Sequence, residues 1–198
     1  GKVDVEVRPG VGIHGYVQKG APIEVPCGHV EGIIKVPHPH KHKKQILIIL
    51  NYRANGEDQL NHCVIQLKES DQISVTNYTG TDIPSVLKDA PTATWLHDFL
   101  KETLKIDQLF VCNTAPLSCH KGTTEGFIYL LPQGILFLNK TVFVPRVDLA
   151  RIEIAGGARM TFDLHVELHT ETTDKKGVSR PILYEFMIGR EHEDTVMK

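Results

Sequence analysis

Apolar and polar residues alternate over much of this chain, and the alternation predicts a protein built mainly from short strands. Residues 161–169, TFDLHVELH, place four apolar side chains on one face and the polar side chains on the other. Residues 127–131, 135–138 and 142–144 are apolar runs separated by Pro-Gln-Gly and Asn-Lys-Thr, which are typical of turns. We expect these three runs to form an antiparallel meander.

Four further segments are predicted strands. Residues 4–8 alternate in the manner of a half-exposed strand, and residues 46–52 are apolar enough for a buried one. Residues 63–68 return after an Asn-Gly turn signal, and residues 182–188 form the last predicted strand. Strands therefore occur in both halves of the chain.

One segment has helical periodicity instead. Residues 92–104 carry an apolar stripe at helical spacing, which predicts an amphipathic helix whose Trp95 packs in a core. The strands before this helix and those from Leu109 onward suggest two domains of ordinary size, residues 1–105 and 106–198. Residues 191–198 are too few for a second complete closing helix, so we expect that helix to be truncated.

Composition narrows the function classes. The formal net charge is −2, so no global positive field favours nucleic acid, and binding to it would have to be local. The four cysteines lack Cys-x-x-Cys spacing, which favours a reducing compartment. No apolar run is long enough to span a bilayer. The first residues, Gly-Lys-Val-Asp, lead us to expect a piece of a longer protein.

Three motifs in the second half carry a family resemblance. EGFIYLLPQGILF, the later VFVP and the closing RMTF resemble the second pleckstrin-homology (PH) domain of fungal double-PH histone chaperones. Upstream, Val-Pro at 36–37 and the apolar strand that follows Lys43-Lys44-Gln45 are similar to the first PH domain of that family. A weaker similarity links the chain to the middle domains of the FACT chromatin complex subunits.

The resemblance implies a fold and a function. The expected fold class is mainly β, with two tandem PH-like, partly open antiparallel barrels, each closed by a C-terminal helix. The implied function is a nuclear histone chaperone for H3 and H4, including acetylated H3, in replication-coupled nucleosome assembly and heterochromatin silencing. Auxiliary binding of double-stranded DNA is expected, but no membrane, cofactor or metal. Self-association is expected only through regions outside this sequence.

A glycine-containing loop is the candidate histone site. In the resembling chaperones the corresponding loop contributes to binding H3 near an acetylated lysine. The resemblance therefore assigns histone contacts to Gly156, Gly157, Ala158, Arg159 and Thr161. Small residues stand before Arg159 where the family carries hydroxyl and bulky side chains. A flexible hairpin without a binding role is the alternative.

A cationic run in the first half is the candidate DNA site. Lys35, Lys41, Lys43 and Lys44 could contact phosphates, although a solvated loop is the first interpretation of such a run and the phosphate-facing patch the second. The alternating histidines between them make a weak metal motif, because lysines surround them and no cysteine or carboxylate is near in sequence.

An enzyme is not expected. Cys119 and His120 are adjacent, and adjacent residues on a strand point to opposite faces, so a nucleophile and base pair is improbable. Phosphate-binding glycine loops are absent from the sequence. The alternative function is a PH-class adaptor for a peptide or a phosphoinositide, or a FACT-type middle domain. The turn at residues 131–134 has no cation to hold a lipid head group.

Overall fold

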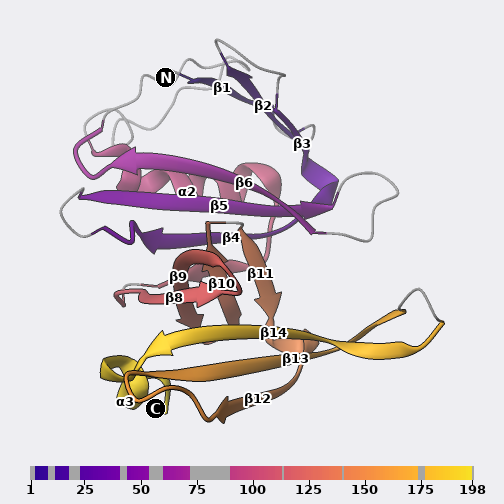
Figure 1. Ribbon diagram of the computed structural model, residues 1–198. Helices are drawn as coiled ribbons and strands as arrows, with labels where there is room; N and C mark the ends of the chain where they lie inside the picture. Colours follow the sequence, from indigo (N-terminus) through magenta and orange to yellow (C-terminus); the bar gives the residue numbers. More distant parts are fainter. Residues whose placement is uncertain are drawn as a thin grey trace. The chain divides into compact units, whose positions relative to one another are not determined.

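The chain forms two compact units, Gly1–Asn113 and Thr114–Lys198, each described by itself below (Figure 1). The computed structural model describes residues 3–8, 12–17, 23–40, 44–53, 60–71, 90–112, 114–139, 141–173 and 177–197. No helix in these ranges is long and apolar enough to cross a membrane.

The first unit contains two sheets and one helix. Strands β1, β2 and β3 form an antiparallel sheet, and β6, β5, β4 and β7 form a second sheet in that order. Helix α2 ends at Leu104, and the left-handed backbone of the capping residue Lys105 turns the chain away from the helix axis. The elements are β1 (Val3–Arg8), β2 (Gly12–Val17), β3 (Ile23–Pro26), η1 (Cys27–His29), β4 (Val30–Pro37), β5 (Gln45–Arg53), β6 (Leu60–Lys68), α2 (Thr92–Leu104) and β7 (Leu109–Val111).

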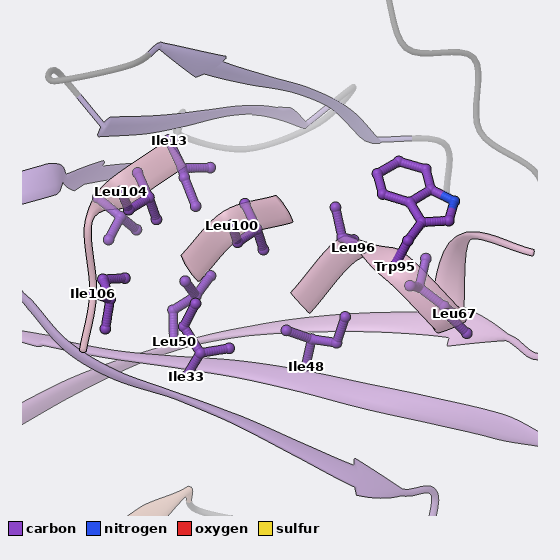
Figure 2. Close-up of a cluster of buried hydrophobic side chains, with 12 residues drawn as sticks. Ile13, Ile33, Ile48, Leu50, Leu67, Trp95, Leu96, Leu100, Leu104 and Ile106 are labelled. Atoms are coloured by element: carbon purple, nitrogen blue, oxygen red, sulfur yellow. The ribbon is translucent and has the colours of Figure 1, made fainter. Parts of the chain in front are cut away.

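Helix α2 supplies much of the core of the first unit. Figure 2 shows its apolar side chains Leu96, Leu100 and Leu104 above Ile48 and Leu50 of β5. The indole of Trp95 is 7% exposed and donates to the carbonyl of Ala90, so the prediction that it packs in a core is confirmed. The predicted helix over residues 92–104 is confirmed as well.

Strand β7 corrects one prediction. The strand at Leu109 was expected to open the second strand set, but β7 pairs in parallel with β4 of the first unit. The amide of Cys112 also donates to the carbonyl of Lys35 at 2.9 Å. The first unit therefore continues past Lys105, because a sheet edge at β4 accepts these residues after the helix has crossed over it. This sheet is consequently mixed rather than purely antiparallel.

The second unit is one curled sheet of seven strands in the order β11-β10-β9-β8-β14-β13-β12. Every neighbouring pair is antiparallel, and β8 joins the two halves by pairing with β14. The elements are β8 (Leu117–Lys121), β9 (Thr124–Leu131), β10 (Gly134–Leu138), β11 (Val142–Pro145), η3 (Arg146–Asp148), β12 (Leu149–Ala155), β13 (Thr161–Thr173), β14 (Ser179–Gly189), η4 (Arg190–His192) and α3 (Glu193–Val196).

The sequence patterns of the second unit are confirmed. Strands β9, β10 and β11 form the predicted meander. The alternate apolar side chains of β13 are all buried, at Phe162, Leu164, Val166 and Leu168. The ring centroids of Phe137 and Phe186 lie 5.4 Å apart in the same core. The mainly β fold class is confirmed and is consistent with a PH-like fold.

Helix α3 is short. It spans four residues and buries none of them. The core of the second unit is therefore closed by strands, through the curl of the sheet, rather than by a helix of the length of α2.

Candidate functional site

The loop that joins β12 and β13 contains the five predicted histone-contact residues. Residues 156–160 are exposed, and Thr161 is half-buried where β13 begins. Met160 is 72% exposed, although it is a large apolar side chain. Arg159 also faces solvent, and no ion pair holds it within the described part of the chain. The loop therefore offers a cation and an apolar side chain at adjacent positions.

Main-chain hydrogen bonds hold the side of this loop that leads into β13. The amide of Thr161 donates to the carbonyl of Ala158 at 3.1 Å, which closes a tight turn. The amide of Arg190 donates to the carbonyl of Met160 at 3.0 Å and ties the loop to the end of β14. The exposed side chains of Arg159 and Met160 are thus carried on a fixed backbone, which lowers the entropy lost when they bind a partner.

The two glycines of the loop have different environments. A Cβ on Gly157 would collide with the backbone of Thr161 and Phe162, so glycine is required there by the fold of the hairpin itself. A Cβ on Gly156 would meet nothing within 4 Å. Gly156 is consequently the glycine at which the surface of the loop is open to a partner.

An acidic face with apolar side chains adjoins the loop. Cross-strand partners on the outward side of β12, β13 and β14 form three rows, which are Arg151, Glu167 and Leu183; Glu153, His165 and Glu185; and Ala155, Asp163 and Met187. Four carboxylates thus share this face with one arginine, which Glu153 contacts at 2.8 Å. The loop begins directly after the Ala155 and Asp163 pair, so it lies at the end of the acidic face.

Sequence reasoning did not single out this face. The available signal was the last strand, ILYEFMI, which is apolar at successive positions and therefore must expose some apolar side chains if only one side is buried. Leu183 and Met187 are those side chains, at 48% and 41% exposure. With Met160 of the loop they place three exposed large apolar side chains at or beside the acidic face.

The predicted DNA-contact lysines are only partly described. Lys41 and Lys43 lie outside the described residues. Lys44 is exposed, with a left-handed backbone (φ 42°) whose carbonyl accepts the amide of Glu69. Lys35 is half-buried opposite Ile48, on the face of the sheet that α2 covers. Burial lowers the pKa of Lys35, and the nearby carboxylate of Asp98 opposes that effect.

Cys119 and His120 point to opposite sides of β8. Cys119 is buried in the core and His120 is exposed. Burial raises the pKa of Cys119 to about 12, so the thiol is protonated at neutral pH. This cysteine acts as a small apolar side chain of the core. Among the described residues no group of three or more His, Cys, Asp or Glu side chains is placed to hold a metal ion.

The strands that carry the loop also carry a match to a known family. Residues 116–191 match the model of the histone chaperone Rttp106-like middle domain. The match runs from the residue before β8 into η4, and so includes β12, the loop, β13 and the acidic face. It confirms the resemblance of the second unit to a histone chaperone family and supports a histone chaperone role in general terms. No curated protein matches the chain.

Proposed function

We propose that this chain is a non-enzymatic histone chaperone module that binds H3 and H4 through the second unit. The observation that carries the proposal is the match of residues 116–191 to a histone chaperone middle domain. The contact surface is the loop of residues 156–161 together with the acidic face, and acetylated H3 is among its ligands. The expected setting is the nucleus, in replication-coupled nucleosome assembly and heterochromatin silencing.

The charges and the exposed apolar side chains of the second unit support this assignment. Histones are basic, and the four carboxylates beside the loop are complementary to lysine and arginine. Leu183, Met187 and Met160 add exposed apolar contacts, which sustain binding when salt screens the charges. Arg159 is then a donor for a carbonyl or acidic side chain of the histone rather than a partner for its lysines.

Titration of a labelled H3 and H4 complex at two salt concentrations tests the proposal. We expect affinity that is micromolar or tighter at physiological salt and that weakens, without vanishing, as salt rises. Arg159→Ala should weaken binding about tenfold, because it removes an exposed charged donor from a fixed loop. Arg180→Ala is the matched control, since Arg180 is an exposed arginine of the same unit on β14. Equal affinities for the two variants would remove the loop from the site.

We also propose auxiliary binding of double-stranded DNA by Lys35, Lys41, Lys43 and Lys44. The double charge reversal Lys43→Glu and Lys44→Glu should reduce the DNA mobility shift and leave the histone affinity close to that of the unmodified protein. Identical DNA shifts would refute this patch. Sedimentation with phosphoinositide liposomes tests the adaptor alternative, and the chaperone proposal expects no sedimentation.

A further inference from the structure

Strand β12 is the last strand of the seven-stranded sheet, and its outer edge is open. Its backbone pairs with β13 on one side, and no strand pairs with its other side within the described residues. Figure 1 shows β12 on the outer side of β13. Natural edge strands are commonly protected by charged side chains, above all lysine, by proline or by a bulge. β12, LARIEIA, has a bulge only near its start, between Leu149 and Arg151, and contains no proline or lysine. Its two charged side chains, Arg151 and Glu153, pair with each other on the outward face of the sheet and leave the pocket side of the strand apolar.

A mostly apolar pocket of about 400 Å³ lies beside this edge within the second unit. Leu149 and Ile152 of β12 line it, together with Leu130, Ile135 and, from α3, Val196. Arg146 of η3 is the charged residue among those that line it. The pocket is thus apolar with a cation beside the start of β12.

Ile152 shows that the apolar layer here is incomplete. Its cross-strand partner Val166 is fully buried, so Ile152 lies on the core side of the sheet. Ile152 is nevertheless 51% exposed. The apolar side of β12 therefore lacks a covering group where its backbone edge also lacks a partner.

We propose that the edge of β12 binds an extended peptide segment as an additional strand. The peptide main chain pairs with the free N–H and C=O groups of β12, which a helix could not do. Side chains of a strand alternate between faces, so every second peptide side chain points to the pocket. One of these is apolar and fills the space beside Ile152 and Val196, and a carboxylate two positions away meets Arg146. This site is separate from the loop and from the outward acidic face.

The probe is a fluorescent peptide, acetyl-Thr-Asp-Thr-Leu-Thr-Asp-Thr-amide, titrated into the whole chain. Threonine favours an extended backbone, and aspartate on both sides of leucine makes the probe independent of strand direction. We expect saturable binding, with amide NMR shifts concentrated in β12, η3 and α3. Replacing the leucine by alanine, or both aspartates by lysine, should each weaken binding about tenfold.

Two protein variants distinguish binding at the proposed site from nonspecific binding of the probe. Ile152→Asp places a charge in the pocket and should abolish probe binding, while its half-exposed position leaves the fold intact by circular dichroism. Leu183→Asp is the matched control, because Leu183 is similarly exposed on the outward face, and it should bind the probe normally.

Several results would overturn the proposal. They are no probe binding at about 1 mM, equal affinity for the alanine peptide, equal affinity of the Ile152→Asp variant, or a dimer paired through β12 that the probe does not displace. The proposal does not depend on histone binding. Loss of probe binding in Ile152→Asp with unchanged H3 and H4 affinity supports it, and failure of histone binding leaves the probe result unaffected.

Discussion

The two units bury their apolar residues by different means. The first unit covers its sheet with a 13-residue helix, and α2 contributes seven buried residues. The second unit curls one sheet around a phenylalanine-rich core and adds only the four residues of α3, none of them buried. Helix α2 packs on the sheet of the first unit, whereas the curled sheet of the second unit has an apolar pocket beside its edge strand β12. The second unit therefore offers a partner both a strand edge at β12 and the pocket beside it.

The largest expected effect is a loss of stability of the first unit when a buried leucine of α2 is truncated. Leu100 is 1% exposed, so Leu100→Ala should lower the free energy of unfolding by about 2–5 kcal/mol through lost burial and a cavity. Fluorescence of Trp95, the single tryptophan, reports this unit during denaturation with urea. Val196→Ala in α3 is the contrasting change. It should lower the stability of the second unit by less than about 1 kcal/mol, measured by hydrogen exchange of the β13 amides. Equal costs would contradict the different roles of the helices.

A smaller effect is expected at the loop of the second unit. Gly157→Ala forces a Cβ against the backbone at the start of β13, and we expect a loss of about 1–3 kcal/mol in the stability of that unit. Gly156→Ala is the matched control, since its Cβ would enter open space, and it should change stability by less than about 0.5 kcal/mol. Hydrogen exchange of β12 and β13 measures both. Indistinguishable variants would show that the hairpin tolerates a shift at Gly157.

The smallest expected effect is a pH dependence of the first unit. Burial lowers the pKa of His62 and His97 below 6.5, and Lys35 adds to the effect at His97. The unfolded chain then binds protons more readily than the folded one, so the histidines favour folding above pH 6.5 and this contribution is lost as the pH falls below that value. The pH dependence is measured from the urea midpoints of Trp95 fluorescence at pH 7.5 and 5.5, which lie about one unit above and below the ordinary histidine pKa.

A histidine substitution sharpens that measurement. His97→Gln should reduce the difference between the two midpoints, because it removes a titrating group whose Nδ1 is buried and unpartnered among the described residues. His120→Gln, at an exposed position, serves as the control. A pH difference that persists unchanged in His97→Gln would assign the effect to His62 or to other groups.

Local patterns predicted the elements well, for a physical reason. The alternation in β13 and the apolar stripe of α2 each show which side of the element is buried. Both elements begin at the predicted residue. Turn chemistry likewise separated β9, β10 and β11. Such signals depend only on near neighbours in the chain.

Features that depend on distant partners were not predictable in the same way. The three residues of β7 carry no periodicity that distinguishes pairing with β4 from pairing in the second unit. Lys35 occurs in a cationic run, yet only its place opposite Ile48 shows that α2 half-covers it. Ile152 has the pattern of a core residue. It is nevertheless exposed, because no further strand of the described chain pairs with the outer edge of β12.

The parallel pairing of β7 with β4 has a consequence for the order of folding. Residues 33–35 leave the ribosome long before residues 109–111, which complete their sheet. Pairing across so long a stretch of chain is entropically costly and slow compared with the hairpins β4–β5 and β5–β6. During synthesis the edge of β4 therefore remains unpaired until α2 and β7 have emerged from the ribosome. A chain cut at Lys105 would keep that edge open permanently and should aggregate more readily than one cut after Asn113.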